Sequence, residues 1–348
     1  MKLLENELYK SDINYITNLD LPWDKIKDKT ILISGASGMI GSCLIDVLMS
    51  ENINANVIAL GRNEEKAKEK FYTYWHLNNF EFLKCDINKA VPEARNIDFI
   101  IHAASNTHPK QYATDPIGTI TTNVIGTYNL LNYAVNNKVK RFMFASSVEV
   151  YGENRGDADK FNESYCGYID CNSLRAGYPE SKRTGESLCQ AFIKQKDLDI
   201  VIPRLSRTYG PTMLMSDSKA IAQFIKKGVA KDNIVLKSEG TQFYSYSYVI
   251  DAVTALLTIL LKGQCGEAYN IADSDSDITL KDIAKTIAQF VGKEVVFELP
   301  DITEATGYSK ATKAILDSKK LKELGWKAKY DIKSGLHRTI QILSEINL

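Results

Sequence analysis

Residues 33–41 read ISGASGMIG and determine the fold expected for the first half of the chain. They place Gly35, Gly38 and Gly41 directly after an apolar run and at the start of a helical pattern. The spacing G-x-x-G-x-x-G predicts a tight turn, a close backbone approach to a pyrophosphate and a helix N-terminus whose free N–H groups favour anions. An ordinary surface turn is the alternative, but the position between a strand and a helix favours a dinucleotide-binding turn.

Short apolar runs alternate with helical patterns through the first two hundred residues. Continuous apolar strands separated by helices form a parallel sheet that is covered on both faces. The predicted fold class is therefore α/β, with a doubly wound parallel sheet. The expected strands are 30–34, 56–60, 80–84, 98–104, 141–146 and 199–204, and the expected covering helices include 126–137 and 181–195.

Beyond residue 204 the alternation gives way to a longer loop, an apolar run at 255–261 and two later helical patterns, which predict a smaller second lobe. A chain of 348 residues also exceeds the ~250–300 residues at which single cores stop growing. The expected division is an N-terminal extension, 1–27, a dinucleotide-binding domain, 28–203 plus 247–273, and a substrate lobe, 204–246 plus 274–348. The role of the extension does not follow from its residues.

Charge and composition indicate a small-molecule substrate. Lysine plus arginine equals aspartate plus glutamate, 43 each, and no basic stripe stands out, so neither nucleic acid nor an anionic membrane is an expected partner. The apolar runs are far shorter than the ~20 residues of a membrane span, and the N-terminus lacks the pattern of a secretory signal. Six cysteines without metal spacing predict reduced thiols, a cytoplasmic location and no metal site.

The end of the second expected strand reads LGRN, and it bears on the choice of cofactor. An acid that binds the ribose 2′-hydroxyl of NAD commonly stands there, about twenty positions after the glycines. Here Gly61 takes that place and Arg62 follows, which favours the 2′-phosphate of NADP; a solvated surface arginine is the alternative. Asp86, after the third strand, is a candidate for the adenine edge or an ordinary turn residue.

The segment GYPESK places Tyr178 four residues before Lys182, on one face of a helix. A phenol with a pKa near ~10 is a weak base at neutral pH, and a nearby ammonium is expected to lower that pKa. Tyr178 could then accept a proton from a substrate hydroxyl while a hydride leaves the same carbon, with Ser147 holding the hydroxyl. A structural helix pair is the alternative for a lone Y-x-x-x-K.

Several motifs in a fixed order carry a resemblance to one family: GASGMIG, IIHAAS, TNVIGTYNLL, SSVEVYG, YPESK, RLSRTYGP, AYNIAD and ELGWKAKYDIKSGLHRTI. From residue 29 to the C-terminus the chain resembles the extended short-chain dehydrogenases/reductases of the NAD-dependent epimerase/dehydratase family, which remodel nucleotide sugars. The resemblance implies a Rossmann domain with a small substrate lobe and a catalytic triad of Ser147, Tyr178 and Lys182. It also implies a homodimer built on helices around 119–136 and 178–196.

The resemblance further implies the ligand contacts. For a bound NAD or NADP it implies contacts with Gly35, Ser37, Gly38, Met39, Ile40, Gly41, Arg62, Asp86, Ile87, Ala103, Ala104, Ser105, Asn123, Tyr178, Lys182 and Arg204. For a nucleotide-sugar substrate it implies contacts with Thr107, Arg175, Arg207 and Tyr244.

Within the family, the segments YCGYIDCNSLRAGYPESK and GPTMLMSDSKAIAQF are similar to those of UDP-glucuronate decarboxylases. Glu149 matches a glutamate that decarboxylases and 4,6-dehydratases share at a strand end. The resemblance implies that a sugar is oxidised at C4, after which Glu149 handles a proton in a step at C5. A strand-end glutamate that faces solvent is the alternative.

Three positions depart from the family pattern. Val148 stands where 4,6-dehydratases carry an acidic aspartate, Tyr244 where the decarboxylases carry an arginine, and Arg207 where the family usually has an asparagine. The first removes a participant in dehydration, and the other two change the groups available to an anionic substrate. A nucleotide-sugar 4-epimerase, in which Glu149 only shapes the pocket, and a non-catalytic NADP-sensing module remain as alternatives.

Overall fold

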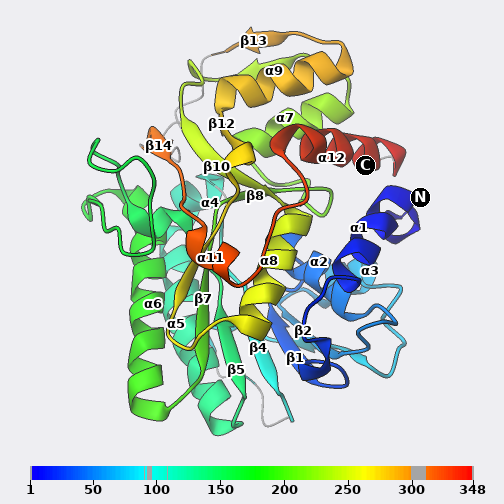
Figure 1. Ribbon diagram of the computed structural model, residues 1–348, viewed down its shortest axis with the longest axis vertical. Helices are drawn as coiled ribbons and strands as arrows, with labels where there is room; N and C mark the ends of the chain where they lie inside the picture. Colours follow the sequence, from blue (N-terminus) through cyan, green and yellow to red (C-terminus); the bar gives the residue numbers. More distant parts are fainter. Residues whose placement is uncertain (1, 90, 92–95, 108, 299–310, 347–348) are drawn as a thin grey trace.

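The largest sheet of the protein has eight strands, all parallel. The computed structural model describes residues 2–89, 91, 96–107, 109–298 and 311–346 (Figure 1). The strands are β1 (Thr30–Ser34), β2 (Asn56–Gly61), β3 (Phe80–Lys84), β4 (Phe99–His102), β5 (Arg141–Phe144), β6 (Ser146–Ser147), β7 (Ile200–Leu205) and β11 (Ala268–Ile271). This confirms the doubly wound sheet, and the ends of the six expected strands differ by at most two residues.

The strand order, β11-β7-β5-β4-β1-β2-β3 with β6 beside β7, reverses between β1 and β4. From β1 the chain proceeds outward to β2 and β3, and from β4 it proceeds in the other direction to β5 and β7. Ser34, the last residue of β1, lies opposite His102, the last residue of β4. At such a reversal a crevice opens beyond the carboxyl ends of the two strands, and this is where doubly wound sheets bind ligands.

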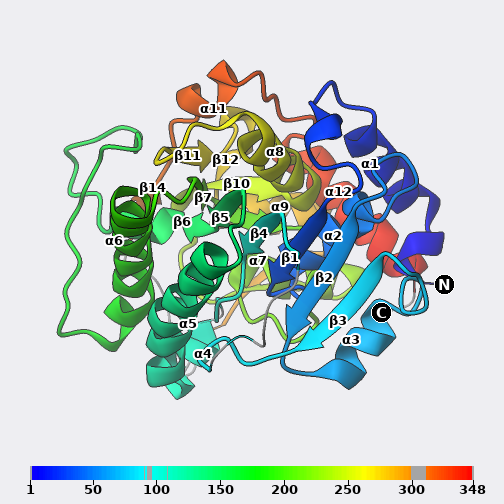
Figure 2. The same cartoon turned by 90° about the horizontal axis from the view of Figure 1, so that it is seen from below.

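Helices cover both faces of this sheet (Figure 2). On one face lie α5 (Pro116–Asn136) and α6 (Gly177–Lys196); α6 contains the expected helix 181–195, and α5 contains the expected helix 126–137 except for its last residue. On the other face lie α2 (Met39–Leu48) and α8 (Val249–Lys262), and α8 is buried nearly all around its axis. Two shorter helices, α3 (Glu64–Lys70) and α4 (Pro109–Thr114), follow β2 and β4. In the described ranges no helix is both long and apolar enough to cross a lipid bilayer.

A smaller lobe stands above the large sheet in Figure 1. One of its sheets contains β8 (Arg207–Tyr209), β10 (Phe243–Tyr248), β12 (Asp277–Thr279) and β14 (Lys313–Ala314), and the other pairs β9 (Ile234–Leu236) with β13 (Val295–Phe297). Around these sheets pack α7 (Ala220–Val229), α9 (Leu280–Val291) and α12 (Ile332–Glu345), whereas α11 (Lys319–Glu323) packs on β11. Because β8 follows almost directly on β7, the chain passes from the large sheet into the smaller lobe without a linker.

The N-terminal extension contains a helix, α1 (Glu7–Thr17), that joins the two lobes. Its Asp12 is fully buried and accepts hydrogen bonds from Nε of Arg338 in α12 at 2.8 Å and from the hydroxyl of Tyr248, at the end of β10, at 2.9 Å. In the same helix, the hydroxyl of Tyr9 donates to Asp46 of α2 at 2.7 Å. The helix therefore fixes α12 against the helix that follows the glycine turn.

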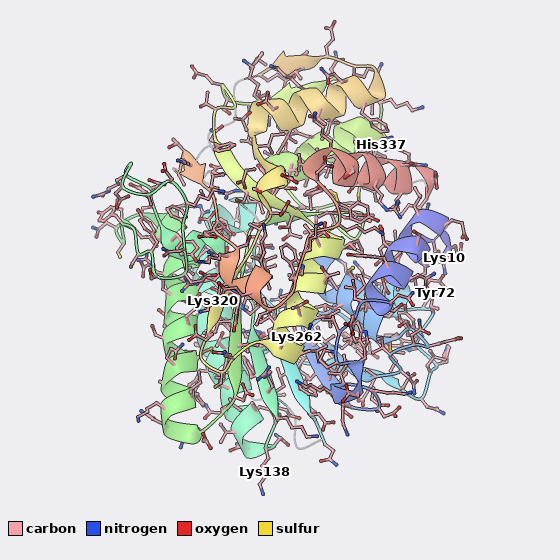
Figure 3. The ribbon with its side chains drawn as sticks, in the orientation of Figure 1. Lys10, Tyr72, Lys138, Lys262, Lys320 and His337 are labelled. Atoms are coloured by element: carbon pink, nitrogen blue, oxygen red, sulfur yellow. The ribbon has the colours of Figure 1, made fainter. Side chains whose placement is uncertain are left out.

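A second set of contacts holds the start of the extension. Tyr72, which follows α3, lies beside α1 (Figure 3). Its hydroxyl donates to Glu5 at 3.4 Å, and Nζ of Lys2 lies 2.9 Å from the centroid of its ring. The extension is thus anchored to the region around α3 as well as to α2 and α12.

Candidate active site

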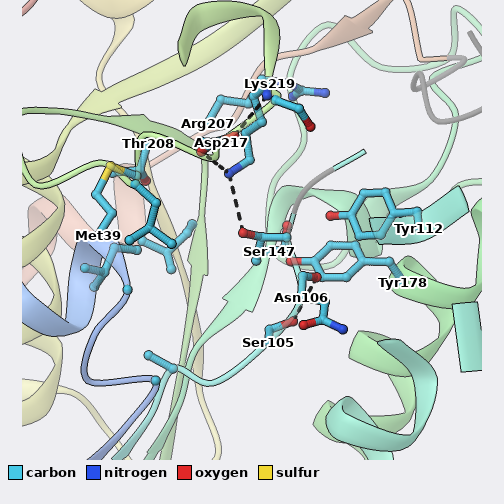
Figure 4. A pocket seen from close by; sticks show the side chains of 18 of the residues that line it. Met39, Ser105, Asn106, Tyr112, Ser147, Tyr178, Arg207, Thr208, Asp217 and Lys219 are labelled. Carbon is cyan, nitrogen blue, oxygen red and sulfur yellow. Dashed lines mark hydrogen bonds and ion pairs between the residues drawn. The ribbon is translucent and has the colours of Figure 1, made fainter. Parts of the chain in front are cut away.

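A cavity of about 580 Å³ opens where the two lobes meet. Its walls come from the glycine turn, from the segments that follow β2, β3 and β4, from β6, and from β8, β10 and α7 of the smaller lobe. Figure 4 shows Tyr112, Tyr178 and Ser147 close together on one wall, with Arg207 and Asp217 across from them. The carboxyl edge of an α/β sheet facing a second lobe is a common position for a ligand site.

The glycine turn fits closely against the end of β4. Gly35 has a φ of +73°, and a Cβ at this position would lie 2.7 Å from the backbone of Ala103. A Cβ at Gly41 would lie 2.4 Å from the carbonyl oxygen of Gly35. Both positions therefore need glycine, and the first turn of α2, with its free N–H groups, is left beside the cavity. The rest of this wall is made by Ser37, Gly38, Met39 and Ile40.

The cavity wall beyond β2 carries two positively charged side chains, one arginine and one lysine. Arg62 and Lys66 both line the cavity and are exposed. The last residue of β2, where an acid would bind a ribose hydroxyl, is Gly61. Asp86 and Ile87, after β3, line the same wall, and Asp86 accepts a hydrogen bond from the N–H of residue 88 at 3.1 Å. The structure thus brings together three predicted cofactor contacts, Arg62, Asp86 and Ile87.

The segment after β4 forms the next part of the wall, with Ala103, Ala104, Ser105 and Thr107. Asn123 of α5 does not line the cavity but lies behind it. It accepts a hydrogen bond from the hydroxyl of Ser105 at 2.7 Å and donates to Ser181 of α6 at 2.8 Å. Asn123 therefore positions Ser105.

Ser147 and Tyr178 meet at the centre of this wall (Figure 4). Ser147 ends β6, and Tyr178 lies in the first turn of α6. Burial raises the pKa of Tyr178 to about 12, although hydrogen bonds with the hydroxyls of Ser147 and Ser105 act in the opposite direction. The sequence argument expected Lys182 to lower this pKa; instead, desolvation of a phenol that is 6% exposed outweighs the favourable contacts.

Lys182 lies one turn further along α6, behind the cavity wall. Its Nζ donates to the carbonyl of Ala145 at 2.7 Å and lies 4.8 Å from the ring centroid of Phe144. Burial lowers the pKa of this ammonium to about 8, although Glu186 acts in the opposite direction. The expected pair thus shares one helix, but the ammonium bonds to the backbone that leads into β6.

Glu149 lies in a short 3-10 helix, η3 (Val148–Tyr151), directly after Ser147, and two arginines hold its carboxylate. Nη2 of Arg175 donates to Oε2 at 2.8 Å, and Nη2 of Arg207 donates to Oε1 at 3.5 Å. Burial alone would raise the pKa of Glu149, but the two guanidinium groups hold it below its usual range. Glu149 is therefore an ionised carboxylate on the cavity wall, and not a solvent-facing strand end.

Each of these arginines stacks on a tyrosine. Cζ of Arg175 lies 4.6 Å from the ring centroid of Tyr112, and that centroid is 5.0 Å from the ring centroid of Tyr178. Cζ of Arg207 lies 3.4 Å from the ring centroid of Tyr244. Arg207 comes from β8 and Tyr244 from β10, which are paired strands, and both side chains line the cavity. Three of the predicted substrate contacts, Arg175, Arg207 and Tyr244, thus belong to one cluster around Glu149.

Arg204, expected among the cofactor contacts, does not line the described cavity. Its guanidinium donates to both carboxylate oxygens of Glu186 in α6, at 2.6 and 2.9 Å, and to the hydroxyl of Tyr151 at 2.9 Å. The ion pair is largely buried, with side chains 13% and 14% exposed. Arg204 is therefore occupied in joining β7 to α6.

Lys66, Tyr112, Asp217 and Lys219 are among the lining residues that were not singled out from the sequence. Tyr112 packs on Tyr178, as described above. Asp217 and Lys219, just before α7, form an ion pair at 3.2 Å, and Nζ of Lys219 donates to Thr107 across the cavity at 3.4 Å. Asp217 and Lys219 lie inside the segment GPTMLMSDSKAIAQF, and the polar residues at its centre could have indicated them as candidate site residues. A lone tyrosine such as Tyr112 offers none, because core tyrosines have the same pattern.

Comparison with known proteins agrees with this geometry. The model of the NAD dependent epimerase/dehydratase family matches residues 31–272. UDP-glucuronic acid decarboxylase 1 of Xenopus tropicalis is 31% identical over 314 residues, which cover 90% of this chain and 71% of that protein. UDP-glucuronic acid decarboxylase 3 of Arabidopsis thaliana is 31% identical over 307 residues, which cover 88% of this chain and 86% of that protein.

Solved structures share the fold. UDP-glucose 4-epimerase of Thermotoga maritima, solved with UDP-glucose, has a TM-score of 0.79 at 25% identity and covers 92% of this chain and 100% of that one. A dTDP-glucose 4,6-dehydratase of Streptomyces venezuelae, with NAD bound, has a TM-score of 0.79 at 24% identity and covers 90% and 97%. Since the family model spans most of the chain and the cavity joins the glycine turn to Ser147 and Tyr178, this chain belongs to the NAD dependent epimerase/dehydratase family.

Proposed function

We propose that the protein oxidises a nucleotide-linked sugar at C4 with a bound nicotinamide cofactor and then acts at C5, as a decarboxylase or dehydratase does. The observation that supports this most directly is that Ser147, Tyr178 and Glu149 line the same cavity as the glycine turn. In this proposal residues 28–203 plus 247–273 hold the cofactor, and residues 204–246 plus 274–348 hold the sugar nucleotide. The two relatives named as UDP-glucuronic acid decarboxylases support the decarboxylating form.

In the first step Tyr178 accepts the proton of the C4 hydroxyl while the hydrogen on C4 leaves as a hydride. A nicotinamide cofactor held beside the glycine turn would supply the acceptor and later the donor of this hydride, so the cycle would need no net redox supply. Ser147 holds the hydroxyl in place, and Ser105 steadies the phenol. In the ligand-free protein burial raises the pKa of Tyr178 to about 12, so its phenolate is not formed before the ligands bind.

The second step starts from the C4 ketone. If C5 bears a carboxylate, the ketone makes a β-keto acid: the bond from C5 to the carboxylate breaks, carbon dioxide leaves, and the electron pair forms an enolate with the C4 oxygen. A proton taken up from water then adds to C5, the hydride returns to C4, and Tyr178 gives its proton back to the C4 oxygen. Glu149, ionised between Arg175 and Arg207, holds no proton of its own at neutral pH and is suited to relay this proton from water to C5.

The product mass tests the proposal. The protein is incubated with UDP-, dTDP-, GDP- and CDP-linked sugars, including uronic acids, and the products are weighed. Loss of carbon dioxide or of water supports action at C5, and an unchanged mass with an inverted C4 supports the alternative 4-epimerase. Tyr178→Phe should keep cofactor binding and lose turnover. Turnover equal to that of the wild type would contradict the role of Tyr178, and no turnover in the wild type would favour a sensing module.

The cofactor proposal is NADP, supported by Arg62 and Lys66 on the wall beyond β2 and by a glycine, Gly61, in place of an acid at the end of that strand. We expect NADP to bind at least about tenfold more tightly than NAD in a fluorescence titration, since a phosphate gains charge-assisted hydrogen bonds. Arg62→Ala should remove most of this preference. Lys68→Ala, an exposed cation of α3 that does not line the cavity, is the matched control. Equal affinities in the wild type would contradict the preference.

The proposed assembly is a homodimer through α5 and α6. Along α5 four large apolar side chains are exposed, at 75%, 41%, 44% and 49%: Ile117, Ile120, Ile125 and Tyr128. Exposed apolar side chains at helical spacing indicate a face that another helix covers. Sedimentation analysis should give a dimer, and Ile125→Glu should give a monomer. A wild-type monomer at micromolar concentration would contradict the proposal.

A further inference from the structure

The corner of the cavity around Glu149 holds three hydrogen-bond donors that have no acceptor among the described residues. They are Nε and Nη1 of Arg175 and Nη1 of Arg207, and all three atoms are buried. Both side chains line the cavity. Buried N–H groups are nearly always paired in folded proteins, so unpaired donors beside a cavity indicate that a ligand supplies the acceptors.

The charges lead to the same conclusion. Two guanidinium groups, with side chains 15% and 18% exposed, share the carboxylate of Glu149. Arginine keeps its proton in proteins, and the two arginines hold the pKa of Glu149 below its usual range. This cluster therefore carries one net positive charge in a partly desolvated corner. One further anionic group would balance it, whereas a neutral sugar would leave it uncompensated.

The stacked tyrosines restrict how that anion can approach. Tyr112 and Tyr244 cover one face of the two guanidinium planes, at 4.6 and 3.4 Å. The unpaired N–H groups lie in those planes, so an acceptor reaches them along the edge. Approach along the edge by two oxygens is the geometry of a carboxylate or a phosphate on a guanidinium.

The position of the cluster distinguishes these two anions. Glu149 follows Ser147 by two residues, and Tyr112 packs directly on Tyr178, so the arginines border the groups that act on C4. In a nucleotide-linked hexose C5 is bonded to C4, whereas the diphosphate is attached to C1 on the other side of the ring. C3 is also bonded to C4 but bears a hydroxyl in such hexoses, so an anion next to the C4-reacting groups is a substituent of C5.

We infer that Arg175 and Arg207 form a subsite for a carboxylate at C5, that the substrate is a nucleotide-linked uronic acid, and that Arg207 selects it over the neutral hexose. This inference rests on the proposed oxidation at C4 in the same cavity. It also accounts for two departures from the family pattern together. Tyr244 replaces the usual arginine on β10, and Arg207 places a guanidinium over the ring of that tyrosine from the neighbouring strand β8.

The test compares affinities for matched nucleotides. Dissociation constants of the cofactor-loaded protein are measured by calorimetry for UDP, UDP-glucose and UDP-glucuronate, and for the dTDP counterparts. The wild type should bind the uronate at least about tenfold more tightly than the hexose of the same nucleotide, as expected for charge-assisted hydrogen bonds. Arg207→Gln should reduce this ratio to near one and leave the hexose constant unchanged. Arg207→Lys should restore part of the ratio, because it keeps the charge without the planar fork.

Lys219→Gln is the matched control, since Lys219 is another cation of the same cavity, paired with Asp217 at 3.2 Å. It should leave the uronate-to-hexose ratio unchanged. Equal weakening of UDP, hexose and uronate by Arg207→Gln would place the diphosphate at Arg207 and overturn the inference, as would a wild-type ratio near one. Turnover, followed by product mass, separates the two proposals. Turnover of neutral hexoses without a preference for uronates would contradict the carboxylate subsite alone. No turnover of any sugar would contradict the proposed oxidation at C4.

Discussion

Replacing Lys182 with methionine is expected to stabilise the fold while it abolishes turnover. Lys182 is 2% exposed, and its ammonium donates to the carbonyl of Ala145 beside the ring of Phe144. Burial lowers its pKa from 10.5 to about 8. At pH 7 Lys182 is therefore still protonated, and burial of its charge makes the folded protein less stable than it would be with an uncharged side chain at this position.

The magnitude follows from that pKa. A fall from 10.5 to about 8 corresponds to roughly 3 kcal/mol of destabilisation at pH 7. Methionine gives up the hydrogen bond to Ala145, about 1 kcal/mol, and the cation–π contact with Phe144, about 0.5–1 kcal/mol. The net gain for Lys182→Met is then about 1–2 kcal/mol. Because the folded pKa lies below the unfolded one, the cost of the wild-type lysine is complete below pH 8 and fades as the pH rises towards 10.5.

Urea unfolding at pH 7 and at pH 10 measures this difference. Lys194→Met, an exposed lysine of the same helix, is the control and should change the free energy of unfolding by less than about 0.5 kcal/mol at either pH. The gain of Lys182→Met should be clear at pH 7 and small or reversed at pH 10. A variant that is less stable than the wild type at pH 7, or a gain that does not depend on pH, would refute the reasoning.

Three further substitutions test other parts of the structure. Asp12→Asn should lower the free energy of unfolding in urea by about 3 kcal/mol because it leaves Arg338 without its buried counterion, whereas Asp20→Asn, exposed in the same extension, should change it by less than about 0.5 kcal/mol. Gly41→Ala should abolish cofactor binding in a fluorescence titration, since its Cβ would lie 2.4 Å from a backbone oxygen of the turn; an unchanged affinity contradicts this. Glu149→Gln should remove the acid limb of the kcat/KM profile, which reports the free enzyme and which we place below pH 4.5 because the pKa of Glu149 is lowered from that value; a limb that persists argues against its role in proton transfer.

The large sheet was predictable because its signals are local. Apolar runs of five or six residues and the glycine turn are each readable within one element, and the parallel order follows from their alternation with helices. The role of α1 is different. Its buried Asp12 meets Tyr248 and Arg338, more than two hundred positions away, and no local pattern records such a contact. Helix α1 therefore stayed an extension of unknown role until the fold was available.

Part of the candidate site could likewise be predicted from local spacing, and part of it depends on contacts between distant segments. The i,i+4 spacing predicted that Tyr178 and Lys182 share a helix face, and the structure has them on α6. The direction of the Tyr178 pKa was wrong because burial, which depends on the whole fold, outweighs the nearby charges. The cluster of Glu149, Arg175 and Arg207 draws on three separate segments, so the sequence could indicate each residue but not that the two arginines share one carboxylate.

Dehydration and loss of carbon dioxide both start from the C4 ketone, but they need different groups. Elimination of water requires an acid that protonates the departing hydroxyl. Val148 offers no proton, Glu149 is ionised, and guanidinium groups hold their protons too tightly to give them up. Loss of carbon dioxide needs no acid at that moment, because the electron pair moves to the C4 oxygen, where Tyr178, protonated in the first step, can donate a hydrogen bond. The charge pattern that suits a uronic acid in this cavity therefore also favours decarboxylation over dehydration.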